Sequence, residues 1–222
     1  AMLVGFFFAL IFTPLKLSKY KTLNLVGNFY TTVIRGVPEL LVIYLFFFGG
    51  SGAIMYVASI FGSEVVKLET SELIITILLI QLVAVLGAFI FSRLSGAYGN
   101  IASLSVALII WVGICIGAFY IGEGDSTMFY MLGAMVGLVM GGAQALSRST
   151  FAKLLPTDTE DHASFFSFYD VSEKVAIILG TFVYGYLIEI TGSMKVSALA
   201  LALFFVAGFI LIMRVKKTDK VH

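Results

Sequence analysis

The twenty residues between Glu72 and Arg93 read LIITILLIQLVAVLGAFIFS and contain no charged side chain. An α-helix rises about 1.5 Å per residue, so these residues reach about 30 Å, which is the thickness of the hydrocarbon core of a bilayer. This stretch therefore predicts a transmembrane helix.

Four other charge-free stretches are of similar length. They contain 24, 29, 22 and 18 residues and lie between Glu39 and Glu64, Arg93 and Glu123, Asp125 and Arg148, and Lys195 and Arg214. Because a charge at mid-bilayer costs roughly 2.5–3.5 kcal/mol on insertion scales, these gaps mark spans. A sixth gap, between Lys174 and Glu189, has only 14 residues. It predicts a span only if its helix begins earlier, within His162–Lys174.

The composition supports this interpretation. Of the 222 residues, 60% are hydrophobic and 12% are charged, and the mean hydropathy is +1.05; soluble domains are about half apolar and a quarter charged. Residues 1–15 are apolar but short, without a cleavage site, and are interpreted as a truncated helix and not as a signal peptide. We predict an all-α, polytopic membrane helical bundle with five to six full spans and this short N-terminal segment.

Composition also excludes several functions. The net charge of +1 gives no basis for a nucleic-acid partner. With one cysteine, Cys115, and two histidines, His162 and His222, neither a metal site nor a cofactor is expected. No nucleophile with a base and no phosphate-binding glycine loop is recognised, so an enzyme is not predicted.

The basic residues predict the orientation. Twelve of the fourteen lie in residues 14–39, 92–100, 147–174 and the C-terminal tail, and the intervening connections hold only Lys67 and Lys195. Short loops rich in Lys and Arg stay cytoplasmic. We therefore expect an integral protein of the cell (inner) membrane, with its C-terminus in the cytoplasm.

Glycines recur at helical spacing. Gly133, Gly137 and Gly141 are four residues apart, and Gly113 and Gly117 repeat the interval. Small residues at this spacing let helix backbones approach closely. We interpret them as packing positions, with flexing during transport as the alternative.

Two segments carry a family resemblance. Residues 141–151 read GGAQALSRSTF, Pro156 follows, and residues 165–174 read FFSFYDVSEK. Together with the order of the spans, these motifs make residues 71–217 resemble the C-terminal half of one branch of the major facilitator superfamily. This branch includes the autophagy-linked vacuolar amino-acid effluxers and bacterial relatives. The resemblance implies secondary transport. Residues 92–99, SRLSGAYG, lack the charged pair of the family's turn, and Glu173 stands where the family has glycine.

The first part of the chain resembles another family. Residues 30–49 read YTTVIRGVPELLVIYLFFFG, and over residues 14–62 the chain is similar to permease subunits of ABC importers for polar amino acids. We predict an ABC-permease-like segment at 1–62, a polar extracytoplasmic loop at 63–72, and a facilitator-like bundle with a cytoplasmic tail at 73–222. The join is either genuine or an artefact of the reading frame.

Polar residues inside spans mark candidate solute contacts. Gln81 lies midway through its span, and Gln144 lies one helical turn before Arg148. The alternatives are an interhelical hydrogen bond for Gln81 and an interface anchor for Arg148.

Residues 162–174 form a second candidate group. On a helix, Tyr169 belongs to an aromatic stripe, whereas Asp170, Glu173 and Lys174 share another face, where Asp170 and Lys174 can pair. This face is interpreted either as a charge cluster at the cytoplasmic mouth of the pathway or as a helix lying among lipid headgroups.

The function predicted is secondary transport of a small solute, with amino acids favoured by both resemblances. A partial ABC permease subunit and a non-transporting fragment are the alternatives. The expected partners are the lipid bilayer, the solute, and either a second copy or a missing N-terminal half of the transporter.

Overall fold

The computed structural model describes residues 38–155 and 162–214, and within them the chain is helical without strands. The elements in chain order are α3 (Pro38–Phe61), the π-helical turn η1 (Gly62–Val66), α4 (Thr70–Tyr98), α5 (Asn100–Tyr120), α6 (Ser126–Leu154), α7 (His162–Thr191) and α8 (Met194–Arg214). The predicted all-α membrane bundle is confirmed. The interpretations of residues 1–37 and of the C-terminal tail lie outside the described residues.

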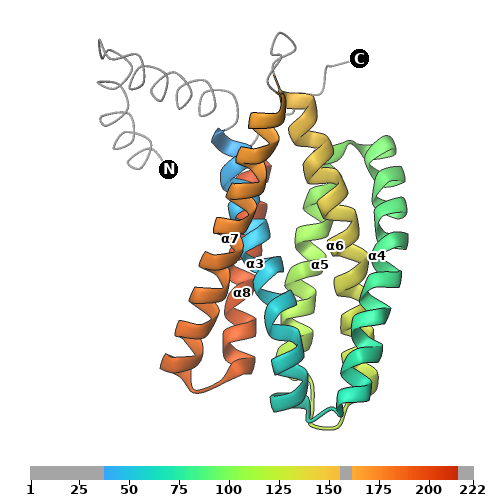
Figure 1. Ribbon diagram of the computed structural model, residues 1–222, viewed down its shortest axis with the longest axis vertical. Coiled ribbons are helices and arrows are strands. Elements are labelled where there is room, and N and C mark those ends of the chain that lie inside the picture. The colour runs from blue at the N-terminus through green and yellow to red at the C-terminus, as the bar shows by residue number, and fades with distance from the viewer. Residues whose placement is uncertain (1–37, 156–161, 215–222) are drawn as a thin grey trace. The chain divides into compact units, whose positions relative to one another are not determined.

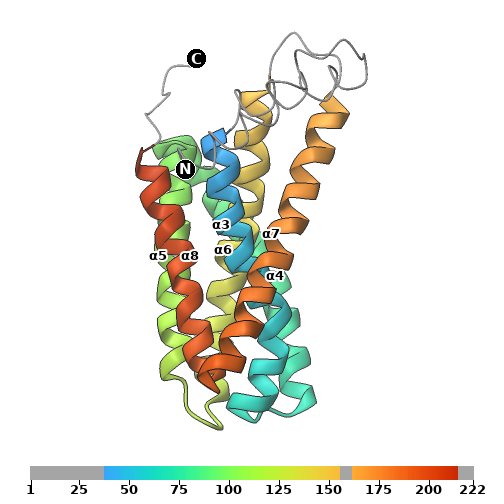
Figure 2. The same ribbon diagram turned by 90° about the vertical axis from the view of Figure 1, so that its left-hand side faces the viewer.

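The chain divides into two compact units, Ala1–Leu40 and Leu41–His222. In the second unit the helices run up and down, side by side (Figures 1 and 2). Helices α4 to α8 are each long and apolar enough to cross a membrane. Helix α7 begins at His162, so the short charge-free gap after Lys174 is part of a 30-residue helix, as its sequence required.

Charges separate the two ends of the bundle. The basic end, at the top of Figure 1, holds the α4–α5 turn, the end of α6 and the start of α7, with Arg93, Arg148 and Lys153. The acidic end holds the α3–α4, α5–α6 and α7–α8 connections. Its acidic side chains are Glu64, Glu69, Glu72, Glu123, Asp125 and Glu189.

The connection predicted at 63–72 is more helical than expected. Helix α3 continues into η1, and the next residue, Lys67, adopts the left-handed conformation (φ 63°). Helix α4 then starts at Thr70 because Glu69 and Glu72 form a reciprocal capping box that satisfies backbone N–H groups. Ser126 of α6 also donates to Glu72, at 2.7 Å, and ties α4 to α6 at the acidic end.

Helices α4 and α6 are in backbone contact along a glycine seam. A Cβ atom at Gly137 would collide with the carbonyl oxygen of Ile80, and one at Gly141 with that of Ala84. From the other side, Gly87 of α4 lies against the backbone of Leu138. Since only glycine fits, the predicted packing role of Gly137 and Gly141 corresponds to direct contact between backbones.

The other predicted packing glycines differ among themselves. A Cβ at Gly133 would lie 2.9 Å from Thr76, and one at Gly117 would lie 2.7 Å from Leu132. At Gly113 a Cβ would meet no described atom within 4 Å, so the prediction does not hold for this glycine. The reason is that Gly113 lies on the exposed side of α5, between the buried Trp111 and Cys115.

A second seam joins α3 to α7. A Cβ at Gly180 would collide with the carbonyl oxygen of Gly49, and one at Gly49 would lie 3.2 Å from that of Ala176. Helix α8 packs against α5, where the rings of Trp111 and Phe205 stack with centroids 5.2 Å apart.

At the basic end, hydrogen bonds join the α4–α5 turn to α6. The turn needs Gly99 because its φ is 88°. The Ser95 hydroxyl donates to the Asn100 carbonyl oxygen, and the Asn100 amide donates to Thr150 of α6 at 2.7 Å. These neutral groups connect the turn where the related facilitators are expected to have a charged pair.

The seam gives a direct stability prediction. Gly141→Ala should lower the free energy of unfolding of the bundle by about 1–3 kcal/mol or more, because an added methyl group in this tight contact forces the backbones to move. Gly113→Ala is the matched control and should stabilise the bundle by up to about 1 kcal/mol through helix propensity. Melting of the purified variants in detergent measures both. Equal melting temperatures for the two variants would contradict a tight backbone contact between α4 and α6 at Gly141.

Candidate functional site

A polar cavity of about 310 Å³ lies between α3, α6 and α7. Its polar lining consists of Ser51 and Tyr56 from α3, Gln144 from α6, and Glu173 and Lys174 from α7. Gln144 and Glu173 each lie about three turns from the basic end of their helices. The cavity therefore belongs to the basic half of the bundle.

Ion pairs link α6 to α7 beside this cavity. The Arg148 guanidinium donates to an Asp170 carboxylate oxygen at 3.1 Å and lies 3.9 Å from the Glu173 carboxylate. Lys174 lies 3.8 Å from the other oxygen of Glu173. Glu173, with 12% of its side chain exposed, thus lies between two cations, and we call Arg148, Asp170, Glu173 and Lys174 the charge cluster.

The predicted pairing of Asp170 with Lys174 is wrong. Asp170 pairs with Arg148 of the neighbouring helix, and Lys174 pairs with Glu173. A guanidinium reaching across from α6 forms a charge-assisted hydrogen bond with Asp170. The spacing within α7 gave no sign of this partner.

Tyr169 is a buried anchor next to the charges. It is 2% exposed, and its hydroxyl lies 2.7 Å from the hydroxyl of the buried Ser147. Its ring packs 5.0 Å from that of Phe151 and 6.0 Å from that of Phe48, centroid to centroid, and Arg148 lies 5.8 Å above it. Tyr169 therefore fixes α6, α7 and α3 around the charge cluster.

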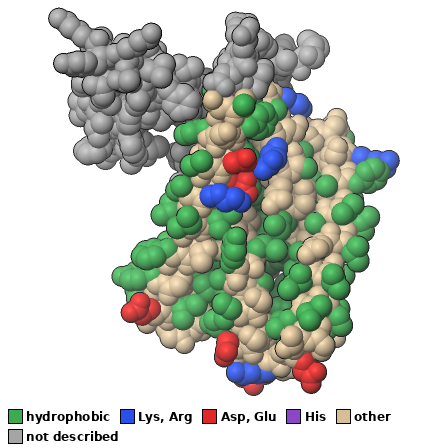
Figure 3. All heavy atoms as spheres, in the orientation of Figure 1, with side chains coloured by type: hydrophobic (Ala, Val, Ile, Leu, Met, Phe, Trp, Pro, Cys, Tyr) green, Lys and Arg blue, Asp and Glu red, His purple; other side chains and the backbone are tan. Residues whose placement is uncertain are grey.

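Three members of the charge cluster are exposed in the midst of apolar side chains. Figure 3 shows acidic and basic groups gathered over α6 and α7 in the upper half of this face. The exposed fractions are 57% for Arg148, 53% for Asp170 and 70% for Lys174. Both helices are candidate membrane spans, so the placement of these charges has to be explained.

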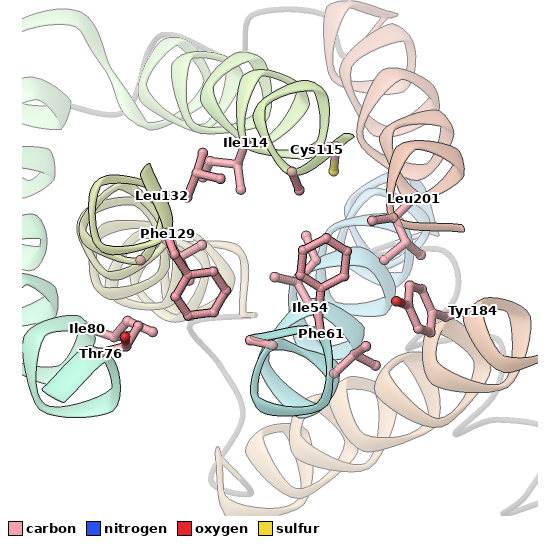
Figure 4. A pocket seen from close by; sticks show the side chains of 16 residues that line it. Ile54, Phe61, Thr76, Ile80, Ile114, Cys115, Phe129, Leu132, Tyr184 and Leu201 are labelled. Carbon is pink, nitrogen blue, oxygen red and sulfur yellow. The ribbon is translucent and has the colours of Figure 1, made fainter. Parts of the chain in front are cut away.

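A second cavity, of about 80 Å³, has a different character (Figure 4). It lies in the acidic half, and apolar side chains such as Ile80, Phe129 and Leu201 point into it. Thr76, Cys115 and Tyr184 add only a few polar atoms, and cavities with such a lining stay dry. It offers no group that would bind a charged or strongly polar solute.

The structure brings together six of the seven predicted solute-pathway residues. Gln144, Arg148, Tyr169, Asp170, Glu173 and Lys174 lie at or beside the polar cavity. Gln81 is separate, because it lies on α4 with its side chain exposed, away from the buried positions such as Thr76 and Ile80 that pack on α6. In the described part of the chain, no group of His, Cys, Asp or Glu is arranged to hold a metal ion.

Sequence reasoning missed Ser147, Ser51 and Tyr56. Ser147 had a signal, since it lies three residues after Gln144 in the quoted motif and so on the same side of the helix. No signal in the sequence pointed to Ser51 and Tyr56. They belong to the segment that resembles ABC permease subunits, and only the fold brings them to the site.

These features define a polytopic helical membrane protein with a polar site between its helices. Residues 5–221 match the model of the family described as vacuole effluxer Atg22 like. The MFS-type transporter YxiO of Bacillus subtilis is 31% identical over 180 residues, which is 80% of this chain and 40% of YxiO. Autophagy-related protein 22 of Eremothecium gossypii is 28% identical over 68% of this chain and 31% of that protein.

The chain belongs to the Atg22-like vacuole effluxer family, a family of membrane transporters of the major facilitator type. It spans less than half the length of these relatives. A shorter match is to the nopaline transport system permease protein NocQ of Agrobacterium fabrum, 49% identical over 61 residues, 27% of this chain and 26% of NocQ. The two resemblances recognised in the sequence are confirmed.

The Tyr169 anchor is testable by removing one oxygen atom. Tyr169→Phe should destabilise the protein by about 1 kcal/mol, because the Ser147 hydroxyl loses a buried hydrogen-bond partner. Tyr186→Phe on the same helix is the matched control, since Tyr186 is 55% exposed, and it should leave the melting temperature unchanged. Equal effects of the two substitutions would remove the anchoring role.

Proposed function

We propose that this chain forms one helical bundle of a secondary transporter and that a small polar solute passes through the cavity between α3, α6 and α7. Transporters of this type place the solute between two bundles near mid-membrane. The chain covers 40% of YxiO, so a second bundle completes the pathway. That bundle is either an N-terminal half or a second copy of this chain.

The observation that carries the proposal is the exposure of Arg148, Asp170 and Lys174 on helices that are long enough to span. Charged side chains facing lipid cost several kcal/mol, so charges within spans face water-filled cavities or protein. A solute pathway supplies such surroundings.

The charge cluster also favours a class of solute. It contains two cations and two carboxylates, and the partly buried Glu173 is held between the cations. A solute with both an ammonium and a carboxylate group can replace these internal pairs without leaving a charge unpaired, and the Gln144 amide can both donate and accept hydrogen bonds. Amino acids have this chemistry.

For the orientation, we infer that the basic end faces the cytoplasm, since short connections rich in Lys and Arg are retained there. The proposed location is the cell membrane.

Two other functions are weighed against transport by this bundle. The resemblance of residues 14–62 and the 61-residue match to NocQ favour a subunit of an ABC importer, which would need an ATPase. An interfacial role for the start of α7, with its charges among lipid headgroups, needs no solute at all. Both alternatives predict that changes at Glu173 leave solute flux unaffected.

Orientation is tested with a charged thiol reagent that does not cross membranes. Glu123→Cys at the acidic end should react only from outside the cell, and Ala97→Cys in the last turn of α4 only from the cytoplasm. The native Cys115 is 1% exposed and serves as an internal control that should not react from either side. The reversed labelling pattern would overturn the orientation.

The solute pathway is tested by amino-acid flux into proteoliposomes that contain the complete assembly. Glu173→Gln should lower the flux at least about tenfold, because Arg148 and Lys174 then lose the carboxylate between them. Glu189→Gln is the matched control on the same helix, at the acidic end, and should transport normally. Normal flux with Glu173→Gln, at equal protein levels, would contradict the solute pathway. It would favour the alternative in which the start of α7 lies with its charges among lipid headgroups.

A further inference from the structure

The second cavity, which we call the apolar cavity, is surrounded by six helices of the bundle (Figure 4). It shares no lining residue with the polar cavity, and in the described part of the chain none of its lining side chains is charged. Helices α3 to α8 each contribute to its wall, in that order through Phe61, Ile80, Cys115, Phe129, Tyr184 and Leu201. It is therefore a separate feature of the bundle, which the proposed solute pathway does not use.

The apolar cavity lies at the depth of the lipid tails. Helix α5 has 21 residues and is about 31 Å long, which matches the hydrocarbon core of a bilayer. Cys115 lies five residues before Tyr120, where α5 ends, and is therefore about 8 Å inside the core. Thr76 lies six residues after the start of α4, at a similar depth. Because small apolar molecules leave water for lipid tails, the bilayer itself supplies them at this level.

The hydrogen bonds of the lining residues restrict the ligand to an apolar molecule. The Thr76 hydroxyl donates to the Glu72 carbonyl oxygen at 2.8 Å, and the Tyr184 hydroxyl donates to that of Met194 at 3.4 Å. Neither hydroxyl therefore offers its proton to a ligand, and the thiol of Cys115 is only a weak donor. A polar group brought into the apolar cavity would lose its water without gaining an equal partner.

The size and the walls of the apolar cavity suit a molecule with one aromatic ring. Its volume of about 80 Å³ is several times the roughly 10–15 Å³ that a water molecule needs. Cavities with walls of Leu, Ile and Phe are known to bind benzene or xenon while water stays out. Phe61, Phe129 and Tyr184 add aromatic rings to these walls, and such rings favour another ring through edge and offset contacts.

We propose that the apolar cavity is a binding site for small apolar molecules of the size of benzene that dissolve in the bilayer. A molecule bound there contacts side chains from both glycine-joined pairs, α4 with α6 and α3 with α7, and its dispersion contacts hold the two pairs together. A ligand that binds only the folded bundle also stabilises it. The inference goes beyond the proposed function, since this site takes no polar solute and needs none to move.

The experiment titrates benzene into the full chain in lipid nanodiscs and follows methyl groups by NMR. The methyl signals of Leu132 and Leu201, which line the apolar cavity, should shift and then saturate as a single site fills. The methyl signals of Leu203, which is 70% exposed on α8, should shift only in proportion to the benzene dissolved in the lipid. Proportional shifts at all three residues would overturn the site.

Filling the apolar cavity separates binding from general effects of benzene on the membrane. Ala118 of α5 and Ala198 of α8 line it, so Ala118→Leu and Ala198→Leu each place three more carbon atoms there. Each should weaken the saturable shift at least about tenfold, because a close-packed interior leaves no room for the ligand. Ala163→Leu, at an exposed position near the start of α7, is the matched control and should bind as the native chain does.

Melting in the same nanodiscs gives a second measurement. Benzene should raise the melting temperature of the native chain and of Ala163→Leu more than that of the two filled variants. Equal rises in all four proteins, or a saturable shift that Ala198→Leu leaves unchanged, would overturn the proposal. Because neither measurement involves solute, failure here leaves the transport proposal standing.

Discussion

The contact of α4 with α6 through Gly137 and Gly141 is the constraint on which the bundle depends. Between helices in a bilayer there is no hydrophobic driving force, since lipid tails are as apolar as leucine, so close packing has to hold them together. At these glycines the backbone of α6 touches carbonyl oxygens of α4, and no side chain can be inserted. Because not even a methyl group fits between them, these contacts fix the distance between the two helices.

The site follows from two such seams. One pairs α4 with α6, and the other pairs α3 with α7 through Gly49 and Gly180. The polar cavity lies between α6 and α7, which belong to different pairs, with α3 closing it. Across this boundary the contacts change from backbone packing to the Ser147–Tyr169 hydroxyl pair and the ion pairs of Arg148. Such polar links can exchange partners with a solute, whereas a glycine seam cannot.

Much of the fold could be predicted from the positions of charges, because a charge in hydrocarbon is costly wherever the chain goes. That rule located the spans, and α7 begins at His162, as its short charge-free gap required. Rules confined to one helix were less successful. The spacing of Asp170 and Lys174 predicted a local pair, but Arg148 arrives from α6, and the spacing of Gly113 could not reveal that it faces open space. Gln81 was grouped with the pathway by its depth alone, since one span's sequence does not say which side meets its neighbours.

The central claim is that the cavity between α3, α6 and α7 takes up solute from water while the acidic half stays dry. Met140 lines this cavity and Cys115 lines the apolar one, so Met140→Cys gives one protein with a thiol in each. A charged thiol reagent added at the basic end should label Met140→Cys, amino acids should slow that reaction, and Cys115 should remain unlabelled. A Met140→Cys thiol as unreactive as Cys115, or one that amino acids never protect, would contradict the account.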